Sequence, residues 1–377
     1  MKYAIRAERI FDGEREIAGK PLVVIADGKI VDVTHARADL QVVDLGDVTL
    51  LPGLVDAHVH LGFDPDGKAA EHLQHDAEDV MLQRIRANAR EALHAGVTTV
   101  RDLGDRSYLT LEARDAGPEV LVSGPPVTTT GGHCWFLGGE ADGIDGIRKA
   151  VTERVERGVD VVKIMVTGGS ITPGSSPFHQ QYTTDEIKAG VEIAHAAGIP
   201  VAVHAHAPAG IRAAVEAGVD SIEHGFFLTP EGAVADWDTV DLLVQKGIYV
   251  STTTARRPSG NPLPPISVRV RENFARMREL GVRLVCSSDA GVGPFSRFDS
   301  VPHGVAEFCD VLGFRPAEAI AAATSVAAQS CGLGGRKGRI APGHDADLLA
   351  VAGDPLKDVA ALLDVRAVFR AGERVSR

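Results

Sequence analysis

Residues 184–224 read TDEIKAGVEIAHAAGIPVAVHAHAPAGIRAAVEAGVDSIEH, and this stretch contains the repeated unit that decides the fold. A helical segment ends at Gly198 and precedes the short apolar run 200–204. A second helical segment ends at Gly218 and precedes the run 221–223. Glycine adopts the left-handed conformation that ends a helix at little cost. A repeated helix–Gly–strand unit is therefore typical of parallel βα architecture.

The same unit recurs along most of the chain. The expected strands are short and mostly apolar, and they span residues 54–59, 97–102, 120–123, 159–166, 200–204, 221–223, 247–252 and 282–287. Helical segments are expected at 77–95, 144–157, 184–197, 209–217 and 268–280, with two more at 301–312 and 316–328. Eight such strands favour a closed barrel over an open sheet. We therefore predict an α/β protein with a (β/α)8 TIM barrel over residues 53–334.

The two ends of the chain follow a different pattern. Apolar runs at 21–26 and 29–33 are joined by Asp27-Gly28, which is a strong hairpin signal. Further short runs at 42–44 and 48–50 complete a small antiparallel sheet, and strand-like runs return at 338–340, 346–351 and 365–369. We therefore predict that residues 1–52 and 335–377 pair into one small β-sandwich domain beside the barrel.

The composition argues against several classes of protein. The 377 residues carry a net charge of −12 and no long run of Lys or Arg, which argues against nucleic-acid binding. No stretch reaches the roughly 18 apolar residues needed to cross a membrane. The four cysteines form no Cys-x-x-Cys pair and indicate no disulfide framework, which fits a reducing cytoplasm. We therefore expect a soluble, cytoplasmic protein that acts on a small molecule.

Residues that can ligate a metal stand at or near the ends of five expected strands. They are His58, His60, Lys163, His204, His224 and Asp289. His58 and His60 point to the same side of the first strand, because side chains alternate along a strand. Lys163 lies within an apolar run, where an unpaired ammonium group is costly to bury. Barrel enzymes gather their active sites at the C-terminal ends of strands, so this set predicts a metal site.

The ordered set resembles the amidohydrolase superfamily, in the version with His-x-His on strand 1, Lys on strand 4, His on strands 5 and 6 and Asp on strand 8. Residues 51–60, LPGLVDAHVH, resemble the usual start of the barrel. Residues 338–348, GRIAPGHDADL, resemble the usual return to the β-domain. The resemblance covers essentially the whole chain. It implies a metal-dependent hydrolase that acts on carbon–nitrogen bonds.

The resemblance also implies roles for the six residues. Lys163 would be carbamylated by CO2, and its carbamate would bridge two metals. His58, His60 and Asp289 would hold one metal, and His204 and His224 would hold the other. These ligands suit Zn²⁺, one or two per chain, and do not exclude manganese, iron or cobalt. The metals would activate water for attack on a carbonyl carbon, and Asp289 would act as general base and then as general acid.

Further motifs are similar to the branch that contains imidazolonepropionase-like proteins and prolidase-type dipeptidases and carboxypeptidases. They are TGGH at 130–133, VTGGS at 166–170 and QYT at 181–183. In that branch the strand-3 histidine faces the substrate, so His133 would stabilise the carbonyl oxygen. Tyr182 is a candidate donor to a substrate oxygen, and Arg256 and Arg257 are candidate ligands for a substrate carboxylate. The bulky tip at 134–139 could line a substrate pocket or pack against a neighbouring loop.

The leading functional expectation is hydrolysis of an amide bond in a small molecule, namely a dipeptide or an N-acyl amino acid. The alternative is hydrolysis of a cyclic amide, lactone, carbamate or urea, because the same activated water attacks all of them. A hydrolytic deaminase fits less well, since deaminases of this fold generally use one metal and do not need the strand-4 lysine. A non-catalytic scaffold is the remote alternative, because such descendants tend to lose metal ligands. The resemblance further implies a homo-oligomer.

Overall fold

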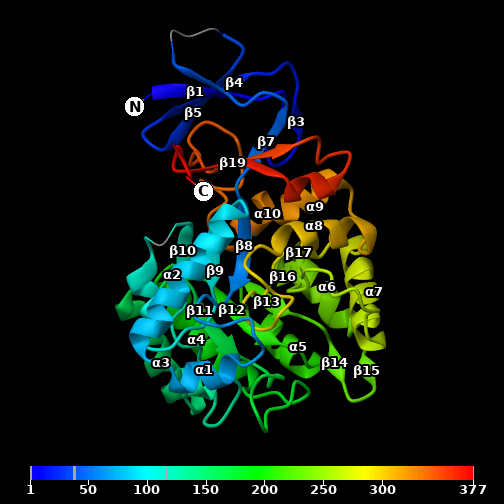
Figure 1. Cartoon of the computed structure of the whole chain (residues 1–377). Helices are drawn as coiled ribbons and strands as arrows, with labels where there is room; N and C mark the ends of the chain where they lie inside the picture. Colours follow the sequence, from blue (N-terminus) through cyan, green and yellow to red (C-terminus); the bar gives the residue numbers. More distant parts are fainter. Residues whose placement is uncertain (1, 37–39, 116, 377) are drawn as a thin grey trace.

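The structure is a computed structural model and describes residues 2–36, 40–115 and 117–376. The first and last segments of the chain, blue and red in Figure 1, lie together at one end of the molecule. The helices and parallel strands between them form the other part. No helix in the described ranges is long and apolar enough to span a membrane.

Eight parallel strands form the centre of the larger part, and each lies where an apolar run was predicted. They are β8 (Leu54–Val59), β9 (Val97–Asp102), β10 (Glu119–Val122), β11 (Val162–Met165), β12 (Val201–Ala205), β13 (Ser221–His224), β16 (Tyr249–Ser251) and β17 (Arg283–Val285). They pair in the orders β10-β9-β8 and β11-β12-β13-β16-β17. Two isolated parallel bridges, Val59–Ala290 and Val127–Ile164, link these two sheets to each other. The ends of β8 and β17 are therefore neighbours.

Helices surround these strands (Figure 1). They are α1 (Ala69–His75), α2 (Glu78–His94), α3 (Gly143–Arg157), α4 (Thr184–Ala196), α5 (Pro208–Ala217), α6 (Trp237–Lys246), α7 (Pro265–Glu279), α8 (Val301–Asp310), α9 (Pro316–Ala322) and α10 (Ser325–Ser330). Helix α4 begins with a capping box between Thr183 and Glu186. Helix α5 has Pro208 in its first turn and ends at Gly218, whose φ of 85° is the expected left-handed cap. Local sequence thus sets where these helices begin and end.

Shorter elements connect the main ones. They are the 3-10 turns η1 (Leu109–Ala113), η2 (Trp135–Leu137) and η3 (Val359–Leu363), and the two-residue strands β14 (Leu228–Thr229) and β15 (Gly232–Ala233).

The chain ends supply two further sheets. Their strands are β1 (Lys2–Arg6), β2 (Arg9–Phe11), β3 (Glu16–Ile17), β4 (Leu22–Ala26), β5 (Lys29–Thr34), β6 (Val42–Asp44), β7 (Val48–Pro52), β18 (Leu348–Ala352), β19 (Val365–Arg370) and β20 (Glu373–Arg374). The sheets have the orders β5-β4-β1-β6 and β20-β19-β18-β7-β2-β3. One apolar core contains Ile5 and Val23 from the first sheet and Leu50, Leu348 and Phe369 from the second. The N- and C-terminal segments therefore share an apolar core.

Two expectations for these end segments are corrected. The hairpin at Asp27-Gly28 is confirmed, because β4 and β5 pair antiparallel across it. However, the N-terminal strands are not wholly antiparallel: β1 pairs with β6, and β2 with β7, in parallel. Residues 338–340 do not form a strand, and the backbone N–H of Ile340 instead donates to the carbonyl of Asp12. Pairing over longer sequence distances decided both features.

One helical expectation is also corrected. The stretch 316–328 forms two helices, α9 and α10, rather than one. The break falls at Thr324, which has φ −134° and ψ −91° and whose hydroxyl donates to the carbonyl of Ile320. Threonine hydroxyls that bond back to the preceding turn favour such bends.

Candidate active site

A cavity of about 170 Å³ opens where the C-terminal ends of the parallel strands meet. All six predicted metal ligands line it, although they come from β8, β11, β12, β13 and the segment after β17. His133 and Arg256 also line it. The structure thus brings together every residue that the sequence singled out for this site except Tyr182 and Arg257.

His58, His60 and Asp289 form the first cluster of candidate ligands. Oδ1 of Asp289 lies 3.4 Å from Nε2 of His58 and 3.3 Å from Nε2 of His60. The two histidines alternate on β8 and therefore share a face of the strand. Asp289 has a φ of 54°, an uncommon value for a residue other than glycine. All three side chains are buried, so their nitrogen and oxygen atoms converge in a site shielded from bulk water.

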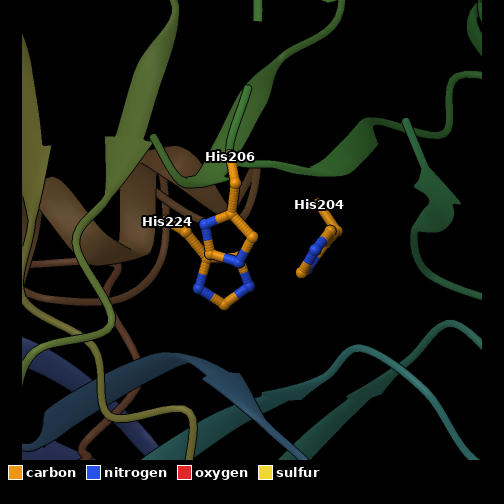
Figure 2. A group of neighbouring side chains, drawn as sticks. All are labelled: His204, His206 and His224. Atoms are coloured by element: carbon orange, nitrogen blue, oxygen red, sulfur yellow. The ribbon is translucent and has the colours of Figure 1, made fainter. Parts of the chain in front are cut away.

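His204 and His224, with His206, form a second cluster (Figure 2). Ring centroids lie 4.5 Å apart for His204 and His224, and 4.6 Å apart for His206 and each of the other two. The sequence interpretation missed His206. A signal for it existed, because His204 and His206 have the same His-x-His spacing as His58 and His60.

Each of the four predicted histidine ligands has one ring nitrogen held by the protein. Nδ1 of His58 lies 2.9 Å from Oε2 of Glu223. Nδ1 of His60 lies 3.3 Å from the backbone carbonyl of Gly104. Nε2 of His204 lies 3.0 Å from the backbone carbonyl of Gly168. Nδ1 of His224 lies 2.8 Å from the hydroxyl of Thr253. Metal-ligating histidines almost always have such an outer partner, which leaves the other nitrogen for the metal.

His206 differs from these four histidines. Its Nδ1 is buried and has no hydrogen-bond partner among residues 2–36, 40–115 and 117–376. A buried, unpaired imidazole nitrogen is costly. The ring therefore has the capacity to bind something that enters the cavity.

Lys163 lies on β11 and is only 1% exposed. Its ammonium group makes no hydrogen bond or ion pair with any residue that the structure describes. Burial lowers the pKa of Lys163 to about 8, against the opposing influence of Glu223 and Asp289. A lysine in this position reaches its neutral amine form far more easily than an exposed one.

Four of the candidate ligands, His58, His204, His224 and Asp289, are held in the protonation states that metal binding requires. Burial lowers the pKa of His58 to about 4, with the charge of Lys163 adding to the effect. Burial also holds the pKa values of His204 and His224 well below the ordinary histidine value. For Asp289, burial would raise the pKa, but His58 and its neighbours outweigh it and hold the pKa below its usual range. These three histidines are therefore neutral and Asp289 is ionised, a donor set that suits a divalent metal.

His133 reaches the cavity from the loop after β10 and is fixed there by Thr172. The Thr172 hydroxyl lies 3.0 Å from Nδ1 of His133 and accepts the backbone N–H of Cys134 at 2.9 Å. A Cβ at Gly169 would come within 2.4 Å of the His133 ring and would displace it, so glycine here leaves room for the ring. If the hydroxyl proton goes to Nδ1, Nε2 of His133 carries the hydrogen, which suits the role of donor to a substrate oxygen.

The sequence left open whether the bulky tip at 134–139 lines the pocket or packs against a neighbouring loop. Cys134 lines the cavity, whereas Phe136 and Leu137 are buried in the core and Trp135 is 40% exposed. Most of the bulky tip therefore packs against the protein rather than lining the pocket.

The structure does not bring Tyr182 to the cavity. This residue is 1% exposed, and its hydroxyl donates to the carbonyl of Ala141 at 2.6 Å. The hydroxyl is thus already used inside the protein, so Tyr182 is not carried into the proposed site.

The model of the Amidohydrolase family matches residues 49–375. Ochratoxinase of Aspergillus niger is 28% identical over 97% of this chain and 84% of its own length. Imidazolonepropionase of Pseudomonas entomophila is 25% identical over 85% of this chain and 82% of its own.

A solved structure is also similar over the whole chain. The crystal structure of a Xaa-Pro dipeptidase with methionine bound in its active site has a TM-score of 0.87 and 29% identity, and each chain covers 100% of the other. These matches confirm the predicted resemblance to the prolidase-like branch. The chain belongs to the amidohydrolase family.

Proposed function

We propose that this protein hydrolyses the amide bond of a dipeptide or N-acyl amino acid that carries a free carboxylate. Family membership and hydrolase relatives make the chain a metal-dependent hydrolase that acts on carbon–nitrogen bonds. The observation that carries the narrower proposal is the cavity itself. It combines six convergent candidate ligands with one arginine, Arg256, that forms no ion pair with any residue the structure describes.

The donor set fits two divalent metals. His58, His60 and Asp289 would hold one, and His204 and His224 would hold the other, with zinc as the expected ion. Lys163 would join both as a carbamate. In that reaction the neutral amine nitrogen adds to the carbon of CO2, and the displaced N–H proton leaves to solvent. The lowered pKa of Lys163 favours this reaction, because only the neutral amine is nucleophilic.

The metals would supply an activated water molecule and a polarised carbonyl when bound. The residues of this chain would do the rest. Asp289, kept ionised by the histidines beside it, would accept the proton of the attacking water and deliver it to the leaving amine. Nε2–H of His133 would donate to the carbonyl oxygen as negative charge develops on it.

Arg256 gives the substrate preference. Its guanidinium is exposed at the cavity and forms no ion pair within the described ranges, and its charge acts on Asp289. A carboxylate is the group that an arginine fork binds best. The apolar residues Met165, Ile171 and Phe226 also line the cavity and suit the side chain of an amino acid.

We infer two finer features of the architecture as well. The bridges at Val59–Ala290 and Val127–Ile164 support closure of the eight strands into a (β/α)8 barrel over residues 53–334. The shared apolar core of the end segments supports a separate β-sandwich domain made of residues 1–52 and 335–377.

The proposal is tested by matched substrates. Metal-loaded protein is assayed against Xaa-Pro dipeptides, N-acetyl amino acids and the same N-acetyl amino acids with the carboxylate capped as an amide. We expect cleavage of the free acids and a loss of at least about tenfold in kcat/KM for the capped compounds. If the protein cleaves neither the dipeptides nor the N-acetyl amino acids, free or capped, but cleaves cyclic amides, lactones, carbamates or ureas, the site belongs to the alternative reaction.

A further inference from the structure

Three buried side chains form a hydrogen-bonded series that ends at His58. Arg101, Glu223 and His58 are each at most 1% exposed and come from three different strands, β9, β13 and β8. Nη2 of Arg101 donates to Oε1 of Glu223 at 2.9 Å. Oε2 of Glu223 lies 2.9 Å from Nδ1 of His58. This series of hydrogen bonds thus connects the interior of the protein to a predicted metal ligand.

The position of Glu223 is fixed from all sides. Arg101 is anchored by donating to the carbonyls of Ala57, at 2.7 Å, and Ser330, at 3.3 Å. The hydroxyl of Ser221 donates to Oε1 of Glu223 at 2.7 Å. Two donors therefore occupy Oε1, and Oε2 is left to accept the Nδ1–H of His58.

Stability alone is a weak explanation for this buried ion pair. Desolvating two charges costs about as much as their attraction returns, and apolar residues of similar size are often as stable. The other three predicted histidine ligands are held by neutral oxygens, from two backbone carbonyls and a threonine hydroxyl. Only His58 has a carboxylate behind it among these four.

A carboxylate partner changes the ligand in two ways. It fixes the tautomer, because Nδ1 must carry the hydrogen that Glu223 accepts, and Nε2 then carries the lone pair. It also raises the basicity of the ring and so strengthens its bond to a metal. Nε2 is the atom that lies 3.4 Å from Oδ1 of Asp289, where the first metal is expected.

We propose that Arg101 and Glu223 are positioning residues that make His58 the dominant ligand of the metal held with His60 and Asp289. This inference rests on the proposed metal site and assigns its affinity to a pair of residues that do not touch the metal or the substrate. Arg101 acts by holding Glu223, and Glu223 acts by holding His58.

The first variant to test is Glu223→Gln. Oε1 of the glutamine would keep the contacts with Arg101 and Ser221, which turns the amide NH2 toward Nδ1 of His58 and favours the wrong tautomer. We expect the dissociation constant of one metal to rise about 10–100-fold, measured by competition with a chromophoric chelator, while the second metal stays bound. Thr253→Val is the matched variant, because it removes the outer partner of His224 and should weaken the other metal instead.

A second variant guards against misfolding. Glu223→Gln leaves Arg101 buried without its counter-charge, so the double variant Arg101→Met/Glu223→Gln removes both charges. Thermal unfolding of the metal-free proteins reports the structural effect separately from metal binding. Both variants are expected to bind the metal held by His58, His60 and Asp289 more weakly than the wild-type protein does. A folded double variant that binds both metals with wild-type affinity would overturn the inference, whereas a wild-type protein that binds no metal would overturn the proposed function instead.

Discussion

The guanidinium of Arg257 is held by Asp299, with Nε donating to Oδ1 at 2.8 Å and Nη2 paired with Oδ2 of the same carboxylate. Arg256, the next residue toward the N-terminus, faces the cavity and has no such partner in the part of the chain that the structure describes. Of these two adjacent arginines, Arg257 is therefore paired with a carboxylate of the protein, whereas Arg256 is available to a ligand. This difference gives a matched pair of variants.

The first prediction concerns these arginines. Arg256→Met should raise KM for substrates with a free carboxylate and lower kcat/KM about 10–100-fold, because a charge-assisted contact contributes about 1.5–3 kcal/mol. Amide-capped substrates should be affected little. Arg257→Met is the control and should leave the ratio between free and capped substrates unchanged. Equal losses on both substrate types with Arg256→Met would exclude carboxylate binding by this residue.

The second prediction concerns His206. Because this residue lacks the outer partner that the four predicted histidine ligands have, we expect it to face the substrate rather than a metal. His206→Ala should therefore keep the wild-type metal content, while kcat/KM falls at least about tenfold. His204→Ala is the comparison and should lose one metal. Loss of a metal from His206→Ala as well would make His206 a ligand.

The third prediction concerns the pH dependence of carbamate formation on Lys163. Its pKa is lowered to about 8, so the neutral amine, which is the reactive form, accumulates as pH rises toward and past 8. At constant dissolved CO2, the rate should rise about tenfold from pH 7 to 9 and then level off. The rate can be followed by NMR with ¹³CO2 on metal-free protein. A rate that still rises tenfold per pH unit above pH 9 would mean an ordinary lysine pKa.

The fourth prediction concerns Tyr182. Tyr182→Phe removes the hydrogen bond to the carbonyl of Ala141 and should lower the free energy of unfolding by about 1–2 kcal/mol. Catalysis should be unchanged, since the hydroxyl does not reach the cavity. Denaturant unfolding and steady-state kinetics measure the two effects. A large rise in KM with unchanged stability would return Tyr182 to the substrate site.

Much of the fold could be predicted because its signals are local. The hairpin at Asp27-Gly28 and the left-handed cap at Gly218 each depend on a few adjacent residues. The parallel pairing of β1 with β6 depends on partners far apart in sequence, and no short pattern distinguishes it from an antiparallel pair. Helix α6 was not named from the sequence, although Asp236 caps it and Gly247 ends it.

The candidate site shows the same division. His58 and His60 could be predicted because their spacing places both rings on one face of a strand. His206 has that spacing relative to His204 but stands beyond the end of β12, where strand alternation no longer guarantees a direction. The role of Glu223 was also out of reach, because its contacts with Arg101 and His58 join three strands that only the folded structure brings together.

Metal content per chain tests the central claim most directly. It should be measured by elemental analysis on protein grown and purified without chelators. Two divalent metals per chain, falling to one or none in Lys163→Ala, are the result expected from a carbamate that joins the His58, His60 and Asp289 cluster to the second cluster at His204 and His224. Protein that holds no metal, even after reconstitution with zinc or manganese and bicarbonate, would contradict the proposed mechanism.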